Sequence, residues 1–108
     1  MLSSKNRLDK KGVDLVFKKG EFIDSSNLMF RFIINNNFLP PRISFVASKN
    51  ISKLAVKRNL LRRKGYSALK ECVNRFPPGT LGVFVFKKYQ DNILTIKNEI
   101  KNILGKIN

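Results

Sequence analysis

The apolar residues of the chain recur at two kinds of spacing, and each kind predicts one type of element. In residues 11–18, Val16 and Phe17 follow Val13 by three and four positions, which is the spacing of one face of a helix. Gly20 comes shortly afterwards, as a C-cap glycine does. The first predicted element is therefore a short helix.

Three short apolar stretches predict strands, because each is rich in β-branched and aromatic residues and too short for a typical helix. They are Asn27–Ile34, Arg42–Ser48 and Leu81–Phe86. A Pro-Pro pair follows the first stretch and excludes both a helix and a central strand there. We expect the first two strands to pair antiparallel, the third to join their sheet, and a further strand near Glu21–Ile23.

Two longer segments show helical spacing. One runs from about Leu54 to Arg75, and the other fills the last part of the chain. The apolar face of the first is Leu61, Gly65, Ala68, Cys72 and Phe76; that of the second is Ile93, Ile96, Ile100, Ile103 and Ile107. Such stripes pack on a sheet. The order is α-β-β-β-α-β-α, a sandwich of helices on a sheet within one domain, residues 1–108.

The charge of the chain limits the classes of partner that it is expected to bind. The chain has 22 Lys and Arg, 7 Asp and Glu, and a net charge of +15, which self-repulsion disfavours unless a polyanion offsets it. Nucleic acid is the leading candidate and a membrane surface the competitor. No run of about 18 apolar residues spans a bilayer and no signal peptide is evident. We therefore expect a cytoplasmic protein with no membrane partner.

The residue inventory argues against chemistry carried by the protein. A single cysteine, Cys72, and the lack of histidine exclude an internal disulfide and a zinc site. Seven scattered acids form no evident acid–base or nucleophilic arrangement. The six glycines form no nucleotide-binding loop.

Basic residues concentrate around the start of the long helix, in a stretch with no acid between Asp24 and Glu71. They are Lys49, Lys53, Lys57, Arg58, Arg62, Arg63 and Lys64. A solvated face normally mixes signs, so this segment favours a polyanion site, where the helix N-terminus adds attraction for phosphate. Helical geometry puts Arg58 and Arg62 near one flank of the apolar seam, puts Lys53, Lys57 and Lys64 near the other, and points Arg63 away. Asn59 is either a plain surface residue or a hydrogen-bonding group for RNA or a metal-bound water.

Aromatic side chains are the second requirement of a single-strand site, because unpaired bases stack on them. The candidates are Phe17, Phe22, Phe30, Phe32, Phe38 and Phe45, although most phenylalanines in one domain belong to its core. Arg31 lies in the middle of an apolar strand. One face of the sheet is therefore expected to be wet or to meet a charged partner.

Two motifs resemble the protein subunit of bacterial ribonuclease P. The stretch "RISFVASKNISKLAVKRNLLRR" is similar to that family's strand ending in Ser-Lys and its "A-V-x-R-N-R-x-K-R" helix, and "NRLDKKGVDLVFKKG" is similar to the family's opening. The resemblance implies a sandwich with a mixed four-stranded sheet and a left-handed βαβ crossover, like a domain of ribosomal protein S-five. The general rule for crossovers would favour the right hand.

The resemblance also implies a function. In the family, a catalytic RNA removes the 5′ leader of precursor tRNA with Mg²⁺ ions, which the RNA subunit mainly holds. One protein monomer per RNA binds that RNA through the Arg-Asn-rich helix and holds the leader between the first helix and the sheet. Two alternatives are a ribosomal or ribosome-assembly protein of similar fold and a non-specific DNA-binding architectural protein.

Carried over by position, Arg58 and Asn59 match the "R-N" of the motif, and Arg62 and Arg63 match its "K-R". Phe17 matches an aromatic residue that faces the leader, and Lys49 a basic residue at the sheet edge. Either Arg31 or Phe32 lies where the family's sheet presents an aromatic residue, since a shift of one residue exchanges the faces.

The chain departs from the motif at three positions. Leu60 replaces its second Arg, and Gly65 and Tyr66 fall where the family has an apolar residue and an Arg. Lys57 and Lys64 are expected to supply the missing charge from other turns of the helix.

Overall fold

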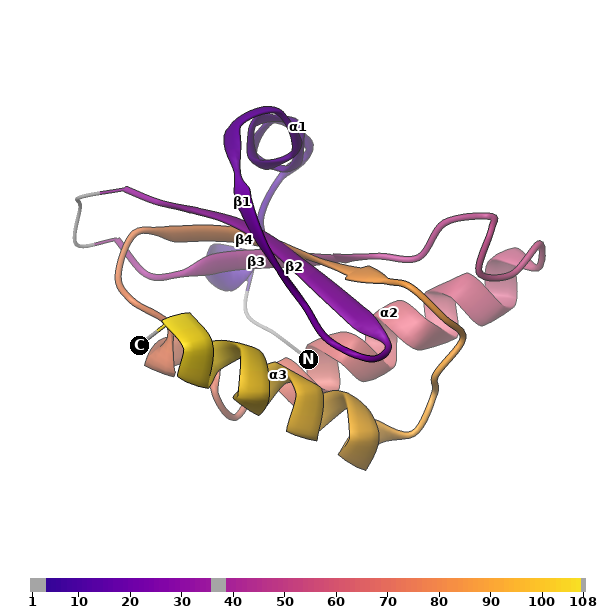
Figure 1. The fold of residues 1–108 in the computed structure, drawn as a ribbon. Helices are drawn as coiled ribbons and strands as arrows, with labels where there is room; N and C mark the ends of the chain where they lie inside the picture. Colours follow the sequence, from indigo (N-terminus) through magenta and orange to yellow (C-terminus); the bar gives the residue numbers. More distant parts are fainter. Residues whose placement is uncertain (1–3, 36–38, 108) are drawn as a thin grey trace.

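The computed structural model describes residues 4–35 and 39–107 (Figure 1). Its strands are β1 (Glu21–Asp24), β2 (Leu28–Ile34), β3 (Arg42–Val46) and β4 (Thr80–Phe86). Its helices are α1 (Lys10–Lys19), α2 (Ala55–Leu69) and α3 (Ile93–Ile107), with short 3₁₀ helices η1 (Ser4–Asn6) and η2 (Val73–Arg75). The predicted order α-β-β-β-α-β-α is confirmed, including the strand near Glu21.

The four strands form one mixed sheet in the order β1-β2-β4-β3. β2 pairs antiparallel with both β1 and β4, and β3 pairs parallel with β4. The antiparallel pairing predicted for the strands Asn27–Ile34 and Arg42–Ser48, which are β2 and β3, is therefore wrong. β4 lies between them because its side chains are buried or half-buried on both faces, as a central position requires.

The parallel pairing of β3 with β4 makes α2 a βαβ crossover, as expected. The left-handedness of this crossover remains a prediction.

α2 and α3 pack together beneath one face of the sheet, whereas α1 crosses the opposite face and is seen nearly end-on in Figure 1. The main core lies on the α2 and α3 side. It includes Phe30, Phe45, Phe84, Leu61 and Ile100, each at most 2% exposed. A smaller cluster of Leu8, Val16 and Val83 attaches α1 to the other face. Much of that face stays only half-covered, because α1 is a single ten-residue helix.

α2 ends at Leu69, six residues earlier than the pattern predicts. The chain then turns and continues as η2, with Cys72 N–H donating to the Leu69 carbonyl at 2.9 Å. The tighter winding lets both Cys72 and Val73 enter the core. All members of the predicted apolar face, from Leu61 to Phe76, are buried even though the last two follow the helix.

None of the helices in the described part of the chain is long and apolar enough to cross a bilayer.

Candidate nucleic-acid interface

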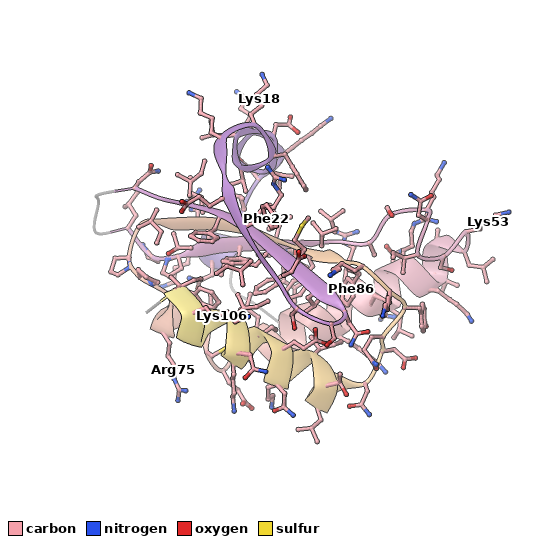
Figure 2. All side chains as sticks on the ribbon, viewed as in Figure 1. Lys18, Phe22, Lys53, Arg75, Phe86 and Lys106 are labelled. Carbon is pink, nitrogen blue, oxygen red and sulfur yellow. The ribbon has the colours of Figure 1, made fainter. Side chains whose placement is uncertain are left out.

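The basic segment predicted from the sequence forms the loop before α2 and the first turns of that helix. Leu54 precedes the helix and offers no side-chain cap, and the first turn carries no acid. The N–H groups of that turn thus have no capping side chain, and they carry the positive end of the helix dipole. Figure 2 shows Lys53 projecting from this end of the molecule, far from the C-terminal part of α3.

Most of the predicted RNA-binding side chains are open to solvent. Lys49, Lys53, Lys57, Asn59 and Arg63 are exposed, whereas Arg58, Arg62 and Lys64 are half-buried. α2 itself, Ala55–Leu69, contains no acidic residue. The segment is therefore a single-sign surface, which suits a phosphate backbone.

Arg58 has a structural partner that the sequence did not reveal. Its Nη1 donates to the backbone carbonyls of Ser52 at 2.9 Å and Lys53 at 3.1 Å. The side chain thereby ties the loop before α2 to the helix. Its charge stays at the surface, but one of its nitrogens is engaged.

The two flanks of α2 meet different neighbours. Lys57 Nζ lies 5.6 Å from the ring centroid of Tyr89, in the segment that leads to α3, which is within cation–π range. On the other flank Arg62 Nη1 lies 3.5 Å from Asn59 Oδ1, a long contact. The predicted separation of Lys57 from Arg62 is confirmed.

Two grooves adjoin this second flank. One, of about 580 Å³, is lined by Arg7, Val56, Asn59, Arg62, Arg63, Tyr66 and Ser67. The other, of about 390 Å³, runs past the start of α1 and along β3, and is lined by Arg7, Leu8, Lys10, Val13, Ser44, Phe45, Val46, Ala47, Arg62 and Tyr66. Arg7, Arg62 and Tyr66 belong to both grooves. Arg7 is not among the RNA-binding residues predicted from the sequence, although it is the Arg of the "NRL" that opens the first motif in the chain.

On the half-covered face of the sheet, Arg31 contacts α1. Its Nη2 donates to the Phe17 carbonyl at 3.1 Å, and its Cζ lies 5.5 Å from the Phe17 ring centroid. Its Nε is buried without a hydrogen-bond partner. Phe22 on β1 is paired with Arg31 in register and therefore lies on the same face. Figure 2 places Phe22 just below α1.

The register settles which residue of β2 faces this surface. Phe17 is 39% and Phe22 58% exposed, so both rings are open to a ligand. Phe32 is 8% exposed and stacks on Phe30 at 5.4 Å in the core. The candidate role of Phe32 is therefore wrong, because Arg31 points to the open face and Phe32 to the core. Phe30 and Phe45 are also core residues, and Phe38 lies outside the described residues.

Three acids have local partners away from the basic start of α2. Asp9 Oδ1 accepts from Gly12 N–H at 2.8 Å and caps α1, while Asp24 and Glu71 pair with Lys87 and Lys97 at 3.4 and 3.1 Å. No group of three His, Cys, Asp or Glu side chains that would suit a metal ion occurs in residues 4–35 and 39–107. The chemical groups of the site are therefore basic side chains, which bind phosphates, and exposed aromatic rings, which stack on bases.

Fold and site together define a small, strongly basic α+β protein with an acid-free helix and an aromatic sheet face, the equipment of a nucleic-acid-binding protein. A sequence model of the ribonuclease P family matches residues 2–108. The chain therefore belongs to the ribonuclease P protein family, a component of an endoribonuclease that processes tRNA.

Individual relatives agree with this assignment. The chain is 28% identical over 109 residues to the ribonuclease P protein component of Pseudanabaena sp. (strain PCC 6903), covering 98% of this chain and 94% of the relative. The RNase P protein from Thermotoga maritima superposes with a TM-score of 0.80 at 21% identity, covering 94% of this chain and 97% of that one. The Staphylococcus aureus protein gives 0.75 at 16% identity, covering 98% and 100%. These two likenesses establish the fold.

Proposed function

We propose that this chain is the protein subunit that binds the catalytic RNA of ribonuclease P and helps it to remove the 5′ leader of precursor tRNA. The observation that carries the proposal is the acid-free basic surface of α2 and its preceding loop, in a chain of this family. Its RNA-binding residues are Lys49, Lys53, Lys57, Arg58, Asn59, Arg62, Arg63 and Lys64. They offer phosphate contacts, which set affinity and register more than base sequence.

The leader occupies the half-covered face of the sheet beside α1 in this proposal. Phe17 and Phe22 present exposed rings there, and Arg31 places a guanidinium between α1 and β2. Unpaired bases stack on such rings, and the guanidinium attracts the backbone. Phe22 takes the role that was predicted for Phe32.

Mg²⁺ is assigned to the RNA subunit. The described residues provide no carboxylate cluster that fits the ion, since Mg²⁺ requires oxygen ligands in octahedral geometry. The protein contributes binding and orientation of RNA in this assignment, acts as one monomer per RNA, and needs no acid–base group of its own.

Reconstitution tests the proposal. The purified protein is added to in vitro transcribed bacterial ribonuclease P RNA with a precursor tRNA, and cleavage is followed over a range of Mg²⁺ concentrations. The proposal expects a lower Mg²⁺ requirement and tighter binding of the leader-bearing substrate. Failure with several bacterial ribonuclease P RNAs, together with tighter binding to ribosomal RNA, would favour the ribosome-assembly alternative instead.

A further inference from the structure

Arg7 and Tyr66 form a contact between the start of the chain and α2. Arg7 lies between η1 and α1, and its Cζ sits 4.6 Å from the centroid of the Tyr66 ring. A guanidinium at this distance over an aromatic face is attracted by the ring quadrupole. Tyr66 is 7% exposed, so its ring is a fixed support rather than a mobile surface group.

Tyr66 is fixed from below by β3. Its hydroxyl accepts a hydrogen bond from the Phe45 N–H at 3.2 Å, and the two rings pack edge to face with centroids 5.2 Å apart. Burial works to raise the pKa of the phenol, but its contacts with the Phe45 N–H, Ser44 and Arg7 hold that pKa below the ordinary value. These contacts hold the phenol oxygen against the edge of the sheet.

The backbone around Arg7 is held in the same way. Asn6 Nδ2 donates to the Pro41 carbonyl at 3.0 Å, and Ser44 Oγ donates to the Leu8 carbonyl at 2.6 Å. Both bonds are buried. The residues on either side of Arg7 are thus bonded to β3 and to the residue just before it. The Arg7 side chain is therefore held both at its backbone and at its guanidinium, which lies over the Tyr66 ring.

Arg7 forms no ion pair with an acid among residues 4–35 and 39–107. The two ion pairs in the described part of the chain, Lys87–Asp24 and Lys97–Glu71, lie elsewhere. Around Arg7 the grooves bring further positive charge from Arg62, Arg63 and Lys10, with no Asp or Glu among the lining residues. An unpaired, restricted guanidinium in an acid-free groove suits a phosphate, which it can bind through two parallel N–H groups.

The position of this contact gives it a specific role. Arg7, Arg62 and Tyr66 line both grooves, one along α2 and the other past α1 and β3. The contact therefore lies where the α2 surface meets the side of the sheet that carries α1. Tyr66 also occupies the helix position where the family motif has an Arg, so the guanidinium above this position comes from Arg7.

We propose that Arg7 is a phosphate-binding residue of the interface with the catalytic RNA, and that Tyr66 is a positioning residue that holds the Arg7 guanidinium at the junction of the two grooves. This inference rests on the proposed function and adds a residue outside the basic helix. Arg7 makes the contact, and Tyr66 acts through Arg7 without touching the RNA itself.

The first experiment compares Arg7→Gln with Arg75→Gln. Arg75 is an exposed arginine in η2, and Figure 2 shows it on the far side of α3 from α1. Both variants lose one positive charge, but only R7Q loses it at the grooves. Binding to in vitro transcribed ribonuclease P RNA is measured at several salt concentrations. R7Q should weaken binding roughly tenfold and reduce the salt slope by about one unit. Equal slopes for R7Q and R75Q would overturn the phosphate contact.

The second experiment tests positioning with Tyr66→Leu, Tyr66→Phe and the R7Q/Y66L double variant. Y66L should weaken binding by most of the R7Q effect, and the double variant should bind no worse than R7Q, because Tyr66 acts only through Arg7. Y66F keeps the ring and should bind within about twofold of the unmodified protein. Additive losses in R7Q/Y66L would overturn the positioning role, as would a Y66F loss equal to that of R7Q.

Folding is checked by circular dichroism for every variant, and if Y66L does not fold, R7Q and Y66F still decide between the outcomes. The unmodified protein separates this inference from the proposed function. If it fails to bind ribonuclease P RNA, the proposed function is wrong. If it binds and R7Q leaves both affinity and slope unchanged, only the role of Arg7 is lost.

Discussion

The carboxylate of Glu99 on α3 accepts two hydrogen bonds from Asn27 in the turn between β1 and β2. The Asn27 backbone N–H donates to Oε1 at 2.7 Å and its side-chain amide donates to Oε2 at 2.7 Å. Ser25 Oγ adds a third bond at 2.6 Å, and Glu99 is 7% exposed. Glu99 thus fastens the β1–β2 hairpin, which carries Phe22 and Arg31, to the helix beneath the sheet.

This arrangement predicts a pH-dependent stability. Burial works to raise the pKa of Glu99, but the hydrogen bonds from Ser25 and Asn27 outweigh it and leave the pKa below its ordinary value of 4.5. A lowered folded-state pKa stabilises the fold fully above the unfolded-state pKa and loses that contribution as the pH falls through the folded-state pKa. Urea unfolding should therefore give a free energy that declines as the pH is lowered from about 5.

Glu99→Gln separates this carboxylate from the other acids. The amide keeps the shape of the side chain but loses acceptor capacity, so the free energy of unfolding near pH 7 should fall by about 1–3 kcal/mol. The difference between the two proteins should shrink on acidification, because the carboxyl of the unmodified protein becomes protonated. A difference that stays constant down to about pH 3 would assign the acid sensitivity to other groups.

Gly65 provides a second test, because its position on α2 allows the helix to approach Phe45. A Cβ placed on Gly65 would lie 2.5 Å from Phe45 Cδ2, which forces the ring or the helix to move. Gly65→Ala should therefore lower the free energy of unfolding by about 1–3 kcal/mol, despite the better helix propensity of Ala.

Gly105→Ala is the matched control in α3, where an added Cβ meets no atom within 4 Å. That variant should gain up to about 1 kcal/mol, since only the propensity changes. Urea unfolding of both variants at one pH is the measurement. If both are stabilised, the approach of Phe45 to Gly65 is not tight in solution.

The sequence predicted most of the fold because spacing reports on burial. The apolar face from Leu61 to Phe76 is buried as predicted, and so are Ile96, Ile100 and Ile103 of α3. The prediction was wrong for Ile93, the first residue of α3, which is 40% exposed, and Ile107 at the other end is only half-buried. Strand pairing was not predictable in the same way. Nothing local in β3 distinguishes an antiparallel partner in β2 from a parallel one in β4, and the order depends on which strand buries both faces.

The residues of the candidate site were also predictable only where they are close together in the chain. Basic residues of α2 were found because they are consecutive in the chain, whereas Arg7 meets Tyr66 across 59 positions and only through the fold. The sequence of β2 is apolar on both sides of Arg31, so it does not say whether Arg31 or Phe32 faces the open side of the sheet. The burial of Phe32 and the pairing of Arg31 with the exposed Phe22 decide it. Arg58 was identified as a surface charge, and its bonds to Ser52 and Lys53 carbonyls required the loop geometry.

Arg58 and Arg63 should respond differently to the same substitution. Arg63 is exposed, so Arg63→Gln should reduce the salt slope of RNA binding by about one unit and leave the unfolding free energy within about 0.5 kcal/mol. Arg58→Gln should reduce the slope by a similar amount and also lower stability by about 1–2 kcal/mol, because the Ser52 and Lys53 carbonyls lose their donor.

Salt-dependent RNA binding and urea unfolding of the two variants are the measurements. Arg58→Lys serves as a control that restores the charge without the guanidinium geometry, so it should recover the slope more fully than the stability. Equal stabilities for R58Q and R63Q would show that the bonds to the loop contribute little.

The two faces of the β1–β2 hairpin predict opposite effects for two phenylalanines. Phe22→Ala should weaken binding of a leader-bearing precursor tRNA to the holoenzyme by about 1–3 kcal/mol, since an exposed ring is available for stacking. The same variant should keep its stability and its affinity for tRNA without a leader. Phe32→Ala should lower the free energy of unfolding by about 3–5 kcal/mol instead, because it removes a ring that stacks on Phe30 in the core.

Phe17→Ala lies between these cases, because the Phe17 ring is open to a base but also carries the Arg31 guanidinium. It should reduce leader affinity by about 1–3 kcal/mol. A comparison of leader-bearing and leaderless substrates for all three variants, alongside urea unfolding, separates stacking from folding. If F22A and F17A bind both substrates as the unmodified protein does while remaining fully folded, the leader does not lie on this face of the sheet.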